Sequence, residues 1–328
     1  MTLSRRTLIG TSLGVATSTA AWAATAPSAQ AAPAAEPATP PAGEALSVRT
    51  PDGLTLSATA YGDPAAPEIL FVHGLGQSGL SWHRQVTQLA ARFRLVTFDM
   101  RGHGASSAPD SPDAYADGAR WAADIRAVRE AAGLRRPTLV GWSFGALTVG
   151  HHLKHHGADD LHGVVLTGPV TKFSPELLQP RGLEIGGRLA SADLSVRIQG
   201  IRDTLDATFA GPLGRDEHDR MLVINSLPPR ALQLGYGLVG NEGVDEAFGE
   251  PSRLYVTYGA KDAITRPEMA RRVLDLNPDA RLSVYPNAGH APFYDEPARF
   301  NRELARFAAA GARPRAGGDS GGEPPVSR

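Results

Sequence analysis

Cysteine is absent from this sequence, and its absence narrows the chemistry. None occurs among the 328 residues, which excludes disulfides, thiolate metal sites and a cysteine nucleophile. An excess of one charge is also missing. The formal net charge is −1, and no basic tract lies beyond the N-terminus. The sequence therefore lacks the cluster of positive charge that a nucleic-acid-binding protein needs to contact phosphates. No Gly-rich dinucleotide or phosphate loop follows the first expected strand. We therefore expect no cofactor and no nucleic-acid partner.

The first 31 residues have the features of an export signal. The twin arginine Arg5-Arg6 precedes an apolar stretch of small residues, and Ala29-Gln30-Ala31 has the small-x-small form of a signal-peptidase site. Cleavage at Ala23 is the alternative. The stretch is short and polar for a bilayer span. Together these features resemble a Tat signal, which implies passage through the Tat export machinery, a secreted protein and no stable membrane insertion after cleavage.

The remainder predicts one α/β fold. Residues 32–44 are rich in Ala and Pro, which is typical of a linker, and 311–328 have the composition of a disordered tail. Between them, short apolar runs alternate with helical patterns, which predicts a doubly wound, mostly parallel sheet of about eight strands. We expect strands at Leu54–Tyr61, Ile69–Val72, Leu95–Phe98, Thr138–Gly141, Gly163–Leu166, Leu254–Tyr258 and Arg281–Tyr285. We expect helices at Trp82–Phe93, Tyr115–Ala132, Ala146–His156, Pro267–Leu276 and Pro297–Ala310.

The alternation stops between residues 170 and 250. Apolar positions recur there at helical spacing in Ser195–Phe209 and Asp216–Leu227, and no strand pattern is evident. The sequence therefore predicts a helical insertion at 170–250 between the two parts of the α/β core, 45–169 and 251–310.

The strongest functional motif is Gly141-Trp142-Ser143-Phe144-Gly145. It follows an apolar strand and opens a helix, which is the setting of a nucleophile elbow. A strand that turns sharply into a helix strains its apex residue, and side chains two positions away would meet backbone, so glycine is needed at 141 and 145. The motif predicts that Ser143 is a nucleophile.

A serine nucleophile needs a base and a group that orients the base. His290 follows the last expected strand in Asn287-Ala288-Gly289-His290, which makes it the candidate base. Asp262 follows the strand Leu254–Tyr258 and is the candidate orienting acid, although it could instead cap the next helix. Asp245 is the weaker alternative.

Acyl transfer also needs donors for a developing oxyanion. One candidate is the backbone N–H of Phe144, the residue after the nucleophile. The other is the N–H of Leu75 in the loop His73-Gly74-Leu75-Gly76, which follows an early strand. Trp142 and His73 are candidates for lining the substrate pocket. For Trp142, packing in the core is an equally good interpretation. For His73, we favour the interpretation that its side chain braces the loop through hydrogen bonds.

These motifs resemble those of the α/β-hydrolase superfamily, in its branch of cofactor-free esterases and haloperoxidase-like hydrolases. The resemblance covers about residues 46–310 and includes His73–Gly76, Asp99–Ser106, the elbow, Gly259–Asp262 and Gly289-His290. It implies structural roles for Asp99, Arg101 and His103, and a cap formed by 170–250. Because position 143 is Ser and not Asp, epoxide and carbon–halogen hydrolysis are disfavoured.

A further pattern is four histidines at positions 151, 152, 155 and 156. The H-E-x-x-H arrangement of a zinc enzyme is missing, so we expect an exposed helix end and no metal site. The resulting hypothesis is a secreted serine hydrolase that cleaves a small-molecule ester or lactone. Two alternatives stay open: the same triad used for perhydrolysis, haloperoxidase-like or lyase chemistry, and a non-catalytic binding protein with this fold.

Overall fold

A computed structural model describes residues 40–310 of the chain. The expected export signal, residues 32–39 of the expected linker and the expected tail 311–328 lie outside the described residues. In residues 40–310 no helix has both the length and the apolar character needed to cross a bilayer.

One eight-stranded sheet forms the centre of the molecule, in the order β1-β2-β4-β3-β5-β6-β7-β8. Strand β2 pairs antiparallel with β1 and β4, and the other neighbours pair in parallel. The α/β class and the mostly parallel sheet are confirmed. The strands are β1 (Glu44–Arg49), β2 (Thr55–Tyr61), β3 (Glu68–Val72), β4 (Arg94–Phe98), β5 (Thr138–Trp142), β6 (Gly163–Thr167), β7 (Leu254–Gly259) and β8 (Arg281–Tyr285).

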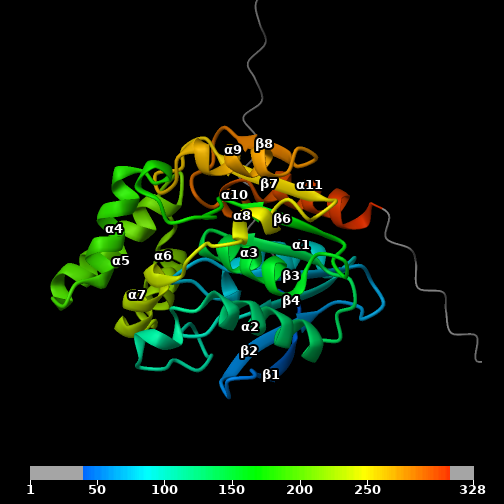
Figure 1. The fold of residues 1–328 in the computed structure, drawn as a ribbon, viewed down its shortest axis with the longest axis horizontal. Helices are drawn as coiled ribbons and strands as arrows, with labels where there is room; N and C mark the ends of the chain where they lie inside the picture. Colours follow the sequence, from blue (N-terminus) through cyan, green and yellow to red (C-terminus); the bar gives the residue numbers. More distant parts are fainter. Residues whose placement is uncertain (1–39, 311–328) are drawn as a thin grey trace, which may run out of the picture. The chain divides into compact units, whose positions relative to one another are not determined.

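Helices cover both faces of this sheet (Figure 1). Most lie where expected. The pattern Trp82–Phe93 forms a shorter helix, α1, and α2 begins at Gly118 because Asp117 caps it by accepting from the Ala119 N–H. The α-helices of the core are α1 (His83–Leu89), α2 (Gly118–Ala131), α3 (Phe144–His156), α9 (Pro267–Leu276), α10 (Pro292–Asp295) and α11 (Pro297–Ala309). Short 3-10 helices are η1 (Gly79–Trp82) and η2 (Pro112–Ala114).

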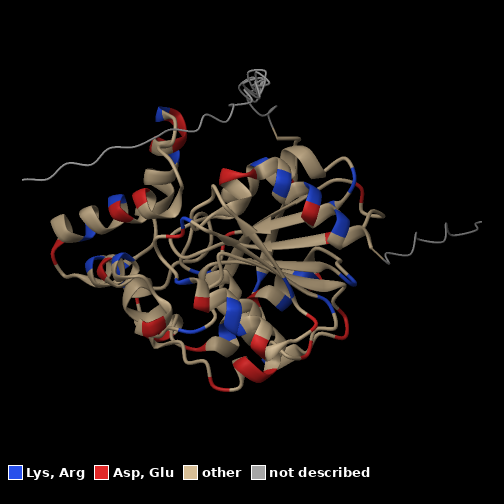
Figure 2. Ribbon diagram, turned by 90° about the horizontal axis from the view of Figure 1, so that it is seen from above, with Lys and Arg blue, Asp and Glu red and all other residues tan. Residues whose placement is uncertain are grey.

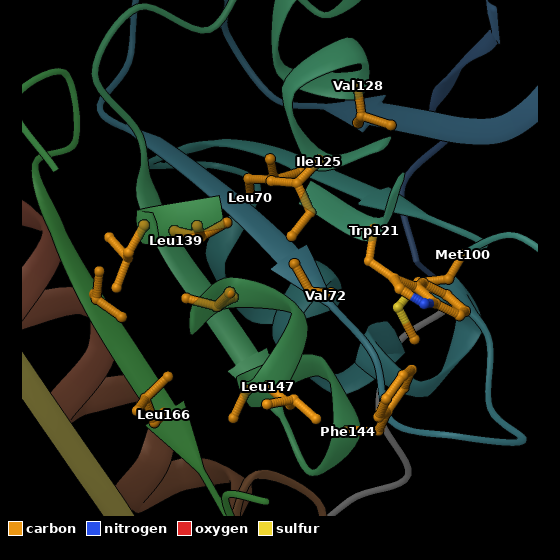
Figure 3. Packing of buried hydrophobic residues seen from close by; sticks show 14 of the residues in the cluster. Leu70, Val72, Met100, Trp121, Ile125, Val128, Leu139, Phe144, Leu147 and Leu166 are labelled. Atoms are coloured by element: carbon orange, nitrogen blue, oxygen red, sulfur yellow. The ribbon is translucent and has the colours of Figure 1, made fainter. Parts of the chain in front are cut away.

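Alternate residues of the central strands supply two separate hydrophobic clusters. In β3, Leu70 and Val72 face the cluster that packs against α2 and α3, whereas Ile69 and Phe71 face the cluster beneath α1 and α11. Figure 3 shows the first cluster, in which Leu139 of β5 lies among the side chains from these helices. Burial on both faces explains why the sequence of these strands is continuously apolar.

The insertion between β6 and β7 is helical, as the sequence predicts, and we call residues 170–250 the cap. It comprises η3 (Pro175–Leu177), α4 (Pro180–Ala190), α5 (Leu194–Thr208), α6 (Arg215–Ser226), α7 (Arg230–Gly235), η4 (Tyr236–Leu238) and α8 (Val244–Ala247). Helices α4 to α7 gather on one side of the sheet in Figure 1. Helix α8 instead packs against α3, and Phe248 after it is fully buried in the main core.

One feature of the fold differs from expectation. Strand β1 begins at Glu44, inside the expected linker. Val48 is the sole buried residue of this edge strand, so the sequence of the strand has no clear apolar pattern. Charged residues of both signs are scattered over the outer helices and loops, as Figure 2 shows, while the central strands are largely uncharged.

Candidate active site

Ser143 occupies a strained turn between β5 and α3. Its backbone angles are φ 53° and ψ −122°, and within residues 40–310 it is the sole non-glycine residue with positive φ. A residue in this region is strained by about 1–3 kcal/mol and is retained where the surrounding structure fixes it. The turn lifts the Ser143 side chain away from the sheet, as the elbow motif predicts.

The flanking glycines make this turn possible. A Cβ atom at Gly145 would lie 2.5 Å from the His73 carbonyl oxygen and 2.6 Å from that of Val72. A Cβ atom at Gly141 would lie 2.8 Å from the Gly145 carbonyl oxygen. Because both approaches involve backbone atoms that cannot move aside, the steric reason for glycine at these positions agrees with the geometry.

Three side chains distant in sequence meet at the carboxyl ends of the parallel strands. The Ser143 hydroxyl lies 2.8 Å from His290 Nε2, and His290 Nδ1 lies 2.8 Å from Asp262 Oδ2. An ionised carboxylate can only accept, so Nδ1 carries the proton and Nε2 is left as an acceptor for the serine hydroxyl. His290 and Asp262 are 2% and 5% exposed, so this chain of hydrogen bonds is shielded from water.

Asp262 does not cap helix α9, whose first turn receives no side-chain cap. Its Oδ1 instead accepts from the N–H groups of Ile264 and Thr265 in the loop before that helix, and its Oδ2 also accepts from the Thr265 hydroxyl. These donors hold the carboxylate in one orientation toward His290. The alternative acid, Asp245, instead forms an ion pair of 2.5 Å with Arg272.

The loop that carries His290 is tied at two further points. The Trp142 indole N–H donates to the His290 carbonyl oxygen at 3.0 Å, and the Gly289 N–H donates to Asp295 Oδ2 at 2.7 Å. Asp295 also accepts from the N–H of Ala210 in the cap, at 3.1 Å to the same oxygen. Asp295 thus connects the His290 loop to the cap, and the sequence analysis did not identify it.

The two backbone amides expected to bind an oxyanion are available. Leu75 and Phe144 both line the cavity above Ser143, and in the described part of the chain neither N–H donates to a protein acceptor. Phe144 is the first residue of α3, where free amides favour negative charge. Gly74 lets the loop approach, since a Cβ atom there would lie 3.1 Å from the Ser143 Cβ.

Two buried histidines brace this loop. His73 Nδ1 donates to the Gly74 carbonyl oxygen, and its Nε2 accepts from the Met100 N–H at 2.9 Å. His103 donates to the Arg101 carbonyl oxygen and accepts from the Gly76 N–H at 3.0 Å. Burial lowers the pKa of His73 to about 4, so the ring is neutral and can accept. The candidate assignment of His73 to the pocket is wrong, because its side chain is fully buried in these contacts.

Two other polar residues of the Asp99–Ser106 stretch are also structural. Asp99 accepts from the N–H groups of Gly79 and Ala105, and the buried Arg101 pairs with Asp124 at 2.7 Å. None of these contacts reaches Ser143. They fix the loop that follows β4 against the one that carries the Leu75 amide.

A cavity of about 350 Å³ lies between the cap and the carboxyl ends of the strands. Ser143, His290 and Trp142 form part of its floor, and residues of α4, α5 and α7 form its walls. Trp142 is both a pocket residue and a packing residue, because it lines the cavity and also packs against Phe293, with 4.9 Å between the ring centroids. No Asp, Glu, Lys or Arg is among the described residues that line this cavity.

The expected exposed helix end holds for only part of the four histidines of α3, since His155 is exposed and His156 is partly exposed, whereas the two before them are buried. His151 and His152 are 5% and 0% exposed, and His151 Nε2 lies 2.9 Å from the Gly240 carbonyl oxygen. Over residues 40–310, no group of three or more His, Cys, Asp or Glu side chains is arranged to hold a metal ion.

Comparison with known proteins identifies the family. The model of the alpha/beta hydrolase family matches residues 69–303. The structure of a candidate aryl esterase from Burkholderia cenocepacia is 32% identical, with a TM-score of 0.77 over 81% of this chain and 100% of that one. An esterase from a Rhodococcus species has 26% identity and a TM-score of 0.75 over 81% and 98% of the two chains.

A curated relative gives the same result. The pimeloyl-(acyl-carrier protein) methyl ester esterase of Chromobacterium violaceum is 30% identical over 258 residues, which cover 73% of this chain and 93% of that protein. The family match, the elbow geometry and the sheet order agree with one another. The chain belongs to the alpha/beta hydrolase family.

Proposed function

We propose that this protein is an exported serine hydrolase that cleaves a carboxylic ester or lactone of a small molecule. The observation that carries the proposal is the continuous hydrogen-bonded chain from Ser143 through His290 to Asp262, with both links at 2.8 Å. In this reading the three residues form a catalytic triad, and the similarity to esterases supports ester chemistry.

The mechanism follows from the placement of these groups. Ser143 Oγ attacks the acyl carbon while His290 Nε2 takes the hydroxyl proton, and Asp262 stabilises the imidazolium that forms. The N–H groups of Leu75 and Phe144 bind the tetrahedral oxyanion. His290 then gives its proton to the leaving alcohol. Water repeats the sequence on the acyl-enzyme and releases the acid.

The walls of the cavity support a proposal for the class of substrate. A charged substrate group in a cavity without a countercharge would lose its hydration and gain no ion pair. The volume of about 350 Å³ is in the range of pockets that bind small molecules. We therefore favour neutral esters or lactones over anionic substrates.

Active-site labelling tests the hydrolase proposal. A fluorophosphonate probe is expected to label the wild-type protein and not Ser143→Ala, while p-nitrophenyl ester turnover falls to background in the variant with an unchanged melting temperature. Labelling of Ser143→Ala, or burst kinetics retained by it, would overturn the proposal. A wild-type protein that binds esters without being labelled would be a binding protein. A panel of esters, lactones and acids with hydrogen peroxide separates hydrolysis from perhydrolysis and lyase chemistry.

Export rests on the twin arginine and needs its own test. In a host with a Tat system, the wild-type chain is expected in the exported fraction, and replacement of Arg5 and Arg6 by Lys is expected to retain it inside the cell. An equal distribution of the two proteins would remove export from the proposal without affecting the hydrolase.

A further inference from the structure

Two polar side chains of the cavity wall have no hydrogen-bond partner among the residues that the structure describes. Gln233 on α7 has a buried side-chain oxygen that accepts no hydrogen bond within residues 40–310. Tyr236, three residues later in η4, also lines the cavity, and its hydroxyl bonds to no described residue. Buried polar groups such as the Gln233 oxygen are rarely left without a partner.

The other polar groups of the cavity wall are already engaged. The Thr204 hydroxyl donates to the Gly200 carbonyl oxygen at 2.8 Å, and that of Thr208 donates to Thr204 at 2.7 Å. Asn225 donates to the Met221 carbonyl oxygen at 2.8 Å. Gln233 and Tyr236 are therefore distinguished from their neighbours by having hydrogen-bonding capacity that is free for a ligand in the cavity.

The position of the Tyr236 hydroxyl is fixed by its ring. The ring packs edge-to-face on Phe144 and Phe173, with centroids 5.7 and 5.5 Å apart, and it cannot swing freely. Phe144 supplies one of the proposed oxyanion amides, so Tyr236 lies on the wall that adjoins the reacting centre. Burial raises the pKa of Tyr236 to about 12, which leaves the hydroxyl protonated as a donor.

We propose that Gln233 and Tyr236 form a subsite for a hydroxyl group of the substrate, separate from the ester that is cleaved. The inference rests on the proposed hydrolase function and narrows its substrate class. A hydroxyl accepts from Tyr236 and donates to the Gln233 oxygen, so one group satisfies both. A carbonyl only accepts and would leave the Gln233 oxygen unpaired, while a carboxylate would be buried without a cation.

The subsite predicts preference for neutral esters or lactones of hydroxylated acids or diols. The test compares p-nitrophenyl 6-hydroxyhexanoate with p-nitrophenyl hexanoate, together with shorter and longer homologous pairs. For each enzyme variant we compare one ratio, which is kcat/KM for the hydroxylated ester divided by kcat/KM for the ester without the hydroxyl group. We expect the best pair to give a wild-type ratio above one, and Tyr236→Phe and Gln233→Met each to lower it about tenfold, the effect of one lost hydrogen bond.

Thr204→Val is the matched control. It also removes a hydroxyl from the cavity wall, but this hydroxyl is already bonded to the backbone, so the ratio is expected to match that of the wild type. A ratio that stays the same in Tyr236→Phe, Gln233→Met and Thr204→Val, or that falls equally in all three, overturns the subsite.

A binding measurement separates failure of the subsite from failure of the hydrolase proposal. Calorimetric titration of the wild-type protein with hexanamide and 6-hydroxyhexanamide needs no turnover, and the hydroxylated amide is expected to bind about tenfold tighter in the wild type but not in Tyr236→Phe. Equal binding of both amides by both proteins refutes the subsite even when fluorophosphonate labels Ser143. Selective binding without labelling of Ser143 would retain the subsite and reject the hydrolase.

Discussion

In the α/β core, a methyl group added at Gly145 would lie 2.5 Å from a backbone oxygen, whereas one added at Gly187 in the cap would meet no atom within 4 Å. Surface composition shows the same contrast. Among residues 40–310, every large exposed hydrophobic residue except Leu80 and Val284 lies in the cap. The core holds the reacting groups in one geometry, and the cap that encloses them leaves more of its large hydrophobic side chains exposed.

This difference indicates a division of labour within the site. Ser143, His290, Asp262 and both candidate oxyanion amides belong to the core, while the two unpartnered polar groups of the cavity belong to the cap. Changes in the core should therefore affect the chemical step or the fold, and changes in the cap should affect the choice of substrate.

The largest expected effect concerns the core carboxylate. Asp262→Asn keeps an oxygen for the Ile264 and Thr265 amides but places an amide donor opposite His290 Nδ1. The ring would then favour the other tautomer, with Nε2 protonated and unable to accept from Ser143. We expect kcat for p-nitrophenyl esters to fall by about 10⁴ with the melting temperature nearly unchanged. A loss below about tenfold would mean that Asp262 does not orient His290.

Next in size is the paired replacement of one glycine in each region. Gly145→Ala should lower the free energy of unfolding by about 3 kcal/mol, because the new methyl group meets the carbonyl oxygens of His73 and Val72. Gly187→Ala should raise it by about 0.5–1 kcal/mol, since it improves a helix without contact. Urea unfolding of both variants measures the two changes. Equal changes in the free energy of unfolding would show that the two glycine positions do not differ in how tightly they are packed.

Stability should also depend on pH through the core. Burial lowers the pKa of His73 and His152 to about 4, and burial with the nearby His73 lowers that of His103 to about 3. The unfolded chain binds protons below the ordinary value of 6.5, so this contribution is complete above pH 6.5 and is lost as the pH falls toward 4. We expect a loss of about 2 kcal/mol per histidine between pH 7 and 5.

The cap supplies the control for this pH dependence. Its sole histidine is His218, which is partly exposed on α6. His103→Gln keeps an acceptor for the Gly76 amide and should reduce the slope of unfolding free energy against pH, whereas His218→Gln should leave it unchanged. The same slope in both variants would show that the core histidines do not set it.

The sequence predicted the core better than the cap for a physical reason. Strands buried on both faces, such as β3 and β5, appear as continuous apolar runs, and the elbow requires glycines at fixed positions. Helices α4 and α7 were not predicted, because α4 contains three glycines and leaves Leu183 exposed, and α7 spans only six residues. Short helices of this kind are set by their neighbours and not by their own periodicity.

The site shows the same limit. Ser143, His290 and Asp262 follow motifs or strand ends, so their meeting could be predicted from the order of the chain. The role of Asp295 could not be predicted, because its carboxylate accepts from the backbone amides of Gly289 and Ala210. Every residue except proline has such an amide, so the residue types at these positions do not indicate the contact. For His73, the favoured prediction of a loop-bracing residue agrees with the structure, and the alternative of a pocket residue does not, because a motif places a residue near the site without indicating which way its ring points.

The smallest expected effect tests the contact that joins the two regions. Asp295→Ala removes the acceptor shared by the Gly289 and Ala210 amides, so the His290 loop loses one of its ties to the cap. We expect kcat to fall about tenfold with a smaller change in KM, and Asp295→Asn, which keeps one acceptor oxygen, to recover most of it. Glu296→Ala is the control, since Glu296 accepts from Asn287 and not from Gly289. If both alanine variants lose activity equally, or if the asparagine variant recovers none, the cap and the His290 loop are not coupled through Asp295.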